Sequence, residues 1–426
     1  MSTHATSSPQ SPSTSAGGPP PVTGRLPSLD DYASIVGEAE IEALRGFAGR
    51  LRGRRLKMVN ATAVGGGVAE ILNRLVPLLK EAGVPAAWDV ITGDEPFFVV
   101  TKAMHNALHG DRFDPPPDWE DIFLSTSEQN RARLQFDEDF VVIHDPQPIA
   151  LVAGRGDSRA KWVWRCHIDL SRPNDTVWQF LRPFVEQFDG AIVSSPSFTQ
   201  DLSLPQYLIH PTIDPLADKN RELEPEFVQK VLESYGIDPR RPIVTQVSRF
   251  DRLKDPVGVI KAYRLVRRFN DCQLVLAGGG ASDDPEGAAV LAEAREAANG
   301  DPDIHILDLP PWSHVEINAL QRGSTIVVQK SLREGFGLTV SEALWKKRPV
   351  VASAVGGIPT QVIHKVTGLL VHSVEGTAYQ IRYLLANPGV ARILGEHGHE
   401  HVKESFLITH NLKNYLLLML VLAGEV

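Results

Sequence analysis

The chain has 426 residues, of which 42% are apolar and 22% are charged, and its formal net charge is −9. This length predicts two domains, and the acidic balance argues against a broad surface for nucleic acid or membrane. Two cysteines, Cys166 and Cys272, are too few for a disulfide framework, so we expect buried free thiols.

The two ends of the chain have unusual compositions. Residues 1–24 are almost entirely Ser, Thr, Pro, Gly and Ala, and we expect a disordered tail without the charged and apolar regions of a signal peptide. Residues 415–423 are apolar but far fewer than the roughly 20 needed to span a bilayer. We therefore expect a soluble, cytoplasmic protein in which residues 404–426 form a helix packed on the body.

The first half alternates short apolar runs with segments of helical spacing. We expect a helical lead-in over 29–54, helices over 68–80, 96–110 and 118–135, and strands over 56–60, 84–92, 140–144, 161–167 and 190–194. Such alternation predicts a parallel sheet with helices on both faces. Residues 25–214 should form this domain, and the Pro-punctuated segment 210–220 should lead into the next.

The alternation restarts after this connection. Strands are expected over 243–248, 272–277, 304–307, 324–329, 349–352 and 368–371, and helices over 225–235, 256–268, 285–299 and 314–322 and from residue 340. The predicted fold is α/β, with two doubly wound, Rossmann-like domains, the second over 215–403. In such sheets ligands bind at the carboxyl ends of the strands, so the site should be the inter-domain cleft.

Two carboxylates, Glu334 and Glu342, are separated by seven residues around a Gly-Phe-Gly turn between a strand and a helix. Glycine allows a ligand to approach the backbone closely, and a helix N-terminus favours phosphate. The helix should present three free backbone amides, those of Leu338, Thr339 and Val340. Alone, the pair is also typical of two solvated surface glutamates.

Two loops that follow strands add further candidates. Residues 65–67 are three glycines that either cradle a phosphate or sugar or form a plain tight turn; they match neither a Walker loop nor a dinucleotide fingerprint. Arg249 and Lys254 follow the strand at 243–248, where two cations can stabilise a diphosphate leaving group. The same two charges are equally compatible with an ordinary solvated basic loop.

Histidines follow two strands of the first half. His144, Asp145 and Gln147 belong to a His-Asp-Pro-Gln-Pro stretch, and His167 follows the next strand. These side chains can bind sugar hydroxyls, although a histidine after a strand is more often structural. No His or Cys cluster has the spacing of metal ligands.

Together these motifs resemble those of retaining GT-B glycosyltransferases, the large family of sucrose synthase, sucrose-phosphate synthase and glycogen synthase relatives. The matching features are the paired glutamates, the Ser-Arg-x-Asp-x-x-Lys pattern from Ser248 to Lys254, and the glycine loop. Residues 59–70, 144–148, 164–169, 211–220 and 333–342 are similar to the trehalose glycosyltransferring synthases within that family. The resemblance runs from about residue 56 to the C-terminus.

The resemblance implies transfer of glucose from a nucleoside diphosphate glucose to free glucose, which gives α,α-trehalose reversibly and with retention. Glu342 would bind the ribose, Glu334 the donor glucose, and Arg249 and Lys254 the diphosphate. His167 would contact the donor glucose near its reacting face.

Further donor contacts would come from Gly66, Gly67, Gly335, Phe336, Gly337, Leu338 and Thr339. The acceptor glucose would be bound by His144, Asp145 and Gln147. The resemblance implies no tightly bound cofactor and no protein metal site. A homodimer is expected from it, without nucleic-acid or membrane partners. The sequence leaves open whether ADP-, UDP- or GDP-glucose is the donor and whether Mg²⁺ assists the phosphates.

Several rival activities remain open at this level. A trehalose phosphorylase of the same fold would use inorganic phosphate in place of the nucleotide, although it would have no ribose for Glu342 to hold. The motifs also fit a related glucosyltransferase with another acceptor, a sugar-nucleotide epimerase of the same two-domain plan, or an inactive sugar-binding sensor.

Overall fold

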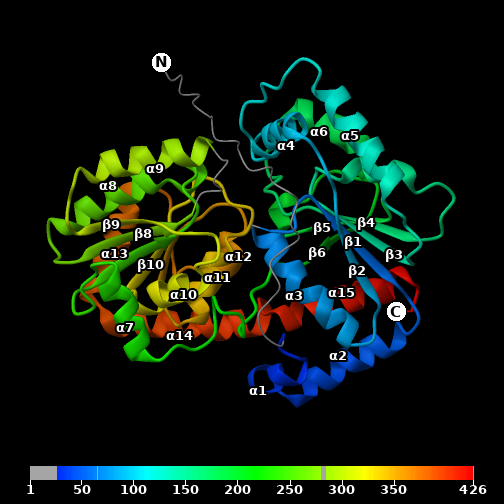
Figure 1. Cartoon of the computed structure of the whole chain (residues 1–426). Coiled ribbons are helices and arrows are strands. Elements are labelled where there is room, and N and C mark those ends of the chain that lie inside the picture. Colours follow the sequence, from blue (N-terminus) through cyan, green and yellow to red (C-terminus); the bar gives the residue numbers. More distant parts are fainter. Residues whose placement is uncertain (1–25, 65, 280–284, 426) are drawn as a thin grey trace, which may run out of the picture.

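The computed structural model describes residues 26–64, 66–279 and 285–425. The predicted tail over 1–24 and Gly65 of the glycine loop lie outside these residues. Two parallel sheets of six strands each stand side by side, and each has helices on both faces (Figure 1). The predicted α/β architecture with two Rossmann-like domains is confirmed.

The first sheet has the order β2-β1-β3-β4-β5-β6, with every neighbouring pair parallel. Its strands are β1 (Leu56–Asn60), β2 (Ala86–Val90), β3 (Phe140–His144), β4 (Lys161–Arg165), β5 (Gly190–Val193) and β6 (Gln206–Leu208). The edge strand β6 was not predicted, because three partly exposed residues carry too weak a pattern.

Helices on both faces of this sheet make two separate cores. They are η1 (Asp30–Tyr32), α1 (Ala33–Val36), α2 (Glu38–Arg50), α3 (Gly67–Glu81), α4 (Glu95–Leu108), α5 (Trp119–Arg133), η2 (Ile149–Gly154), α6 (Asp175–Val185) and η3 (Pro196–Phe198). Local sequence determines where they begin: Asp94 caps α4 by accepting from the amide of Phe97, and Asn174 caps α6 through Thr176.

The second sheet has the order β12-β11-β10-β7-β8-β9, again all parallel. Its strands are β7 (Ile243–Val247), β8 (Gln273–Gly278), β9 (Ile304–Asp308), β10 (Ile326–Gln329), β11 (Val350–Ser353) and β12 (Leu369–Val371). Read from β9 to β12, this is the 3-2-1-4-5-6 order of doubly wound nucleotide-binding sheets.

The helices of this half are η4 (Arg252–Lys254), α7 (Pro225–Ser234), α8 (Pro256–Arg267), α9 (Pro285–Ala298), α10 (His314–Gly323), α11 (Leu338–Trp345), α12 (Ile358–Gln361), α13 (Val374–Ala386) and α14 (Pro388–Ser405). Asp255 caps α8 with a φ of 48° and accepts from the amide of Gly258. Helices on the two faces of this sheet again enclose separate cores.

The last helix, α15 (Ile408–Leu422), returns the chain to the first domain (Figure 1). Its buried residues Ile408, Leu412 and Leu416 belong to the same core as α2 and α3. A β-bridge between Ile213 and Leu407 joins the two segments that cross between the domains. The chain therefore crosses twice, and the two crossings support each other.

Two further properties bear on the sequence predictions. Cys166 and Cys272 are buried and free, as predicted. Over the residues described, no helix is both long enough and apolar enough to cross a membrane.

Candidate active site

Each sheet has one point where neighbouring strands send their following connections to opposite faces. In the first sheet it lies between β1 and β3, and in the second between β7 and β10. Ligands bind outside the carboxyl ends of strands at such points. The predicted site segments lie at the carboxyl ends of these four strands: the glycine loop after β1, His144 to Gln147 from the last residue of β3, Arg249 to Lys254 after β7, and Glu334 after β10. Only the strand order reveals this coincidence.

Lys254 and Glu334 form an ion pair at the switch point of the second sheet. The Nζ atom of Lys254 lies 2.8 Å from Oε1 and 2.7 Å from Oε2 of Glu334. The hydroxyl of Ser331 donates to Glu334 Oε2 at 3.0 Å, and the side chain of Glu334 is only 8% exposed. The carboxylate is therefore held in one orientation by two residues of its own domain.

The turn after Glu334 presses against the first domain. A Cβ atom at Gly335 would overlap the backbone carbonyl oxygen of His167. At Gly67, a Cβ atom would lie 2.9 Å from Cδ1 of Leu338 across the same junction. Gly335 thus brings the backbones of the two domains into contact, whereas Gly67 lies against the side chain of Leu338. Gly66 precedes Gly67 as the N-cap of α3.

His144 and His167 form a hydrogen-bonded pair in the first domain. Nδ1 of His144 lies 3.0 Å from Nε2 of His167, and the two rings stack with their centroids 5.3 Å apart. Burial lowers the pKa of His144 to about 3 and that of His167 well below its usual range, and nearby Arg165 lowers both further. Both rings are neutral at pH 7, so one donates its N–H to the other.

Asp145 directly follows His144 in the chain and has a left-handed backbone conformation, with a φ of 65°. Its Oδ1 accepts from the backbone amide of His167 at 2.8 Å. Burial raises the pKa of its carboxyl to about 6, against the opposing effects of that hydrogen bond and of Arg165. Oε1 of Gln147 is buried without a hydrogen-bond partner among the described residues. Held in an uncommon conformation, Asp145 suits a binding site.

Arg249 differs from the other predicted site residues, because its side chain is 57% exposed. It contacts Asp251 at 3.4 Å. Its charge and that of Lys254 both act on His105, whose pKa burial and neighbouring charges lower well below the usual range. Arg249 therefore lies on the surface beside α4 of the first domain.

Sequence reasoning missed two histidines of α4 and its C-cap. His105 and His109 pack edge to face with centroids 5.0 Å apart, and burial lowers the pKa of both. The charges of Asp169, Glu334 and Lys254 reach His109. His-x-x-x-His on a predicted helix, which places both rings on one face, was the available signal.

The start of α11 corrects one prediction. The amide of Val340 is not free, because it donates to the carbonyl of Gly337 at 2.9 Å. The amides of Leu338 and Thr339 have no acceptor among the described residues. Gly337 is the N-cap, with a φ of 82°. Two amides, rather than three, are thus available to a phosphate.

The Phe336 ring is buried in the core beside α11. It is 4% exposed and packs against His210 and Phe406. It thus belongs to the core that joins the second domain to the crossing segments. Only its backbone is left for a donor contact.

Glu342 occupies the second turn of α11 and is buried, with 2% exposure. Lys219, from the segment between the domains, lies 3.6 Å from its Oε1 atom. Gln321 lies 3.4 Å from Oε2. The sequence did not single out Lys219, because it lies far from Glu342 along the chain.

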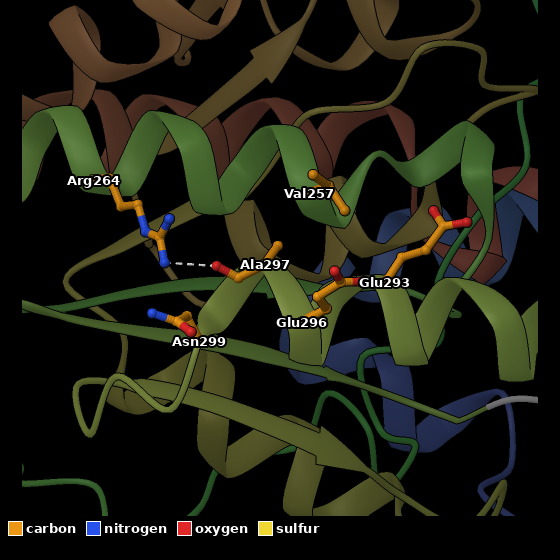
Figure 2. A pocket seen from close by; sticks show the side chains of 6 residues that line it. All are labelled: Val257, Arg264, Glu293, Glu296, Ala297 and Asn299. Atoms are coloured by element: carbon orange, nitrogen blue, oxygen red, sulfur yellow. Dashed lines mark hydrogen bonds between the residues drawn. The ribbon is translucent and has the colours of Figure 1, made fainter.

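A hollow of about 510 Å³ opens elsewhere, between α8 and α9 (Figure 2). It is lined by Val257, Arg264, Glu293, Glu296, Ala297 and Asn299. Arg264 donates to the carbonyl of Ala297 at 2.6 Å across it. None of the predicted site residues lines this hollow, which is a groove between two outer helices rather than a site at strand ends.

Where the chain is described, no three His, Cys, Asp or Glu residues are grouped as a metal site would require. The junction itself offers paired charges, neutral histidines, carboxylates and free amides. Such groups bind sugar hydroxyls and phosphates.

Comparisons with known proteins agree with this geometry. Residues 58–200 match the family model described as trehalose synthase, N-terminal domain, and residues 228–401 match glycosyl transferases group 1. The trehalose synthase of Thermococcus litoralis is 43% identical over 91% of this chain and 95% of its own length. A trehalose phosphorylase of Pleurotus pulmonarius is 27% identical over 92% of this chain and 61% of its own.

Among solved structures, sucrose-phosphate synthase from Thermosynechococcus elongatus aligns with a TM-score of 0.70 and 20% identity. The alignment covers 88% of this chain and all of that one. Identity this low supports the fold alone, whereas the trehalose synthase similarity spans both domains at high identity. The chain belongs to the trehalose synthase family of two-domain GT-B glycosyltransferases.

Proposed function

We propose that this enzyme is a retaining glucosyltransferase that makes α,α-trehalose from a nucleoside diphosphate glucose and free glucose. The observation that carries the proposal is the ion pair between Lys254 and Glu334. The turn that follows Glu334 in the chain lies directly against the backbone of His167. Together they bring a cation, a carboxylate and neutral histidines to the switch points of both sheets. The similarity to trehalose synthases over both domains supports the sugars named.

In this proposal the second domain binds the donor. Lys254 pairs with the diphosphate and offsets the charge that grows on it as the sugar departs. Exposed Arg249 adds a second cation from the rim, and the amides of Leu338 and Thr339 bind a phosphate at the start of α11. Glu334 then turns its oxygens to the hydroxyls of the donor glucose, and Glu342 binds the ribose.

The first domain binds the acceptor. Asp145 and Gln147 receive glucose hydroxyls, and the unpartnered Oε1 atom of Gln147 is an acceptor in need of a donor. His167, kept neutral by burial, contacts the donor glucose while His144 fixes its ring orientation. Neutral imidazoles can donate and accept hydrogen bonds to hydroxyls without adding charge.

We place the chemical step on the face of the leaving group. The bond from the anomeric carbon to the diphosphate oxygen breaks, and a bond to an acceptor hydroxyl oxygen forms on the same face. The departing phosphate takes the proton of that hydroxyl. Double displacement would require a carboxylate on the opposite face, whereas in this proposal Glu334 is assigned to the hydroxyls of the donor glucose. Catalysis is then mainly positioning and charge stabilisation.

The test is incubation with glucose and, separately, ADP-, UDP- and GDP-glucose, followed by linkage analysis of the product. We expect α,α-trehalose and release of the matching diphosphate from at least one donor. A disaccharide with another linkage, or inversion at the donor carbon, would overturn the proposal. Isolation of a covalent glucosyl-enzyme by mass spectrometry would overturn the one-face mechanism alone.

A separate incubation tests for a trehalose phosphorylase activity, which the similarity to the Pleurotus pulmonarius enzyme supports at a lower level. Trehalose and inorganic phosphate, without nucleotide, would then yield glucose 1-phosphate. We expect no such release, because Glu342 would then have no ribose to bind. Mg²⁺ dependence is measured in parallel by adding a chelator.

A further inference from the structure

The segment between the domains supplies an ammonium group that two carboxylates share. Nζ of Lys219 lies 2.8 and 2.9 Å from the two oxygens of Glu70 and 3.6 Å from Oε1 of Glu342. Glu70 belongs to α3, which follows the glycine loop of the first domain, and Glu342 belongs to the second domain. Burial opposes the charge of Lys219, but Glu342 and Glu70 outweigh it and raise its pKa.

The distances to the two carboxylates differ in kind. Contacts of 2.8–2.9 Å to Glu70 are charge-assisted hydrogen bonds, whereas 3.6 Å to Glu342 is too long for one. Glu70 therefore holds Lys219 near enough to Glu342 to offset its charge, yet too far to use its oxygens. Gln321, the other neighbour of that carboxylate, is also long at 3.4 Å.

Glu342 is consequently a buried carboxylate whose acceptor capacity is largely unused. A carboxylate offers about four acceptor positions, and the described residues place no donor within the usual range of charge-assisted bonds around it. The amide of Gln321 is held in place from its other side, because Lys346 donates to its Oε1 at 2.8 Å. The two hydroxyls of a ribose are donors that match this unused capacity.

We infer that Lys219 is a positioning residue for the donor nucleotide, held off Glu342 by Glu70 so that the carboxylate can accept the ribose hydroxyls. This inference rests on the proposed function. It gives α3, the helix that follows the glycine loop, an indirect part in nucleotide binding, because Glu70 of this helix holds Lys219 in place. A ribose that reaches Glu342 shares the carboxylate's charge with Lys219 but does not compete with it for hydrogen bonds.

Two substitutions should disturb this arrangement in the same direction for different reasons. Lys219→Met keeps an apolar stem but removes the ammonium group that lies 3.6 Å from the buried carboxylate of Glu342, so this carboxylate rearranges. Glu70→Gln releases Lys219 to close on Glu342 and to compete with the ribose. Because both act through one group, the double variant should be no weaker in nucleotide binding than Lys219→Met.

The test measures binding of ADP, UDP and GDP and of their 2′-deoxy forms by calorimetry on the full chain. For a diphosphate that binds, loss of the 2′-hydroxyl should weaken its affinity for the wild-type chain about tenfold or more, as expected for the loss of a hydrogen bond to a charged group. In Lys219→Met and Glu70→Gln this ratio should fall below about twofold. Lys230→Met removes an exposed charge from α7 and should keep the wild-type ratio.

The outcomes separate this inference from the proposed function. If wild type binds none of the three diphosphates, the proposed function fails. If wild type binds and discriminates against the 2′-deoxy form, but both variants discriminate equally well, Lys219 is only structural and the inference fails. A lower melting temperature with an unchanged ratio would likewise overturn it.

Discussion

Lys254 and Glu334, 80 positions apart in the chain, neutralise each other at the carboxyl end of the second sheet through two contacts of 2.8 and 2.7 Å. In the proposed reaction these groups serve different parts of the donor. The ion pair keeps both in place before the donor arrives, since without it each would be a largely buried charge that lacks this opposite charge. Donor binding then exchanges one anionic partner of Lys254 for another.

This pairing predicts the behaviour of Lys254→Met. We expect kcat to fall about 10²–10³-fold, because the charge that stabilises the leaving diphosphate is lost. The free energy of unfolding should fall by about 1–3 kcal/mol, since Glu334 loses its short contacts. Adding Glu334→Gln should restore part of this stability without restoring kcat. Lys261→Met, an exposed charge loss on α8, is the matched control, and equal losses there would contradict the assignment.

The acceptor side should depend on pH through Asp145. Burial raises the pKa of its carboxyl to about 6, so the carboxylate that accepts a glucose hydroxyl is present above pH 6 and is lost as the pH falls. We expect kcat/KM for glucose to drop about tenfold per pH unit below 6. Asp145→Asn should lower kcat/KM and remove its dependence on pH below 6, the acid limb of the pH profile. An unchanged limb in the variant would assign the titration to another group.

Folding stability should depend on pH through Lys346. Burial lowers the pKa of its ammonium from 10.5 to about 7. Between these values the unfolded chain binds a proton that the folded chain releases, so stability should rise with pH, by up to about 1.4 kcal/mol per unit. Denaturant unfolding at pH 7, 8 and 9 should show this rise in wild type but not in Lys346→Met. Equal slopes would mean that the three oxygens around Nζ retain the proton as firmly as water does.

The contact between Gly335 and His167 predicts the effect of one methyl group. In Gly335→Ala the new Cβ meets the His167 carbonyl, a backbone atom that cannot rotate away. The junction must open, and we expect about a 10²-fold loss of kcat/KM because the donor and acceptor groups separate. Gly46→Ala, in an open position on α2, should leave kcat/KM unchanged and stabilise the helix by about 0.5–1 kcal/mol. Full activity of Gly335→Ala would show that this junction does not position the reacting groups.

Local patterns predicted most elements of the fold, because strands such as β3, β7 and β8 are buried along their whole length and consist mainly of apolar residues, with Val or Ile prominent in β3 and β7. The same reasoning missed β6, which is short and partly exposed. It also counted the amide of Val340 as free, because the turn that occupies it depends on the left-handed backbone of Gly337. That conformation is permitted by the sequence but not dictated by it.

The sequence by itself determined the class of this protein: alternating strands and helices in two halves, glutamates separated by seven residues, and a basic loop after a strand. These are local properties, since each depends on neighbouring residues and on backbone preference. Only the tertiary structure decided that Lys254 binds Glu334, that His144 pairs with His167, and that Lys219 stands between Glu70 and Glu342. Contacts between residues far apart in the chain follow from strand order and domain packing, which depend on the summed burial of the whole chain.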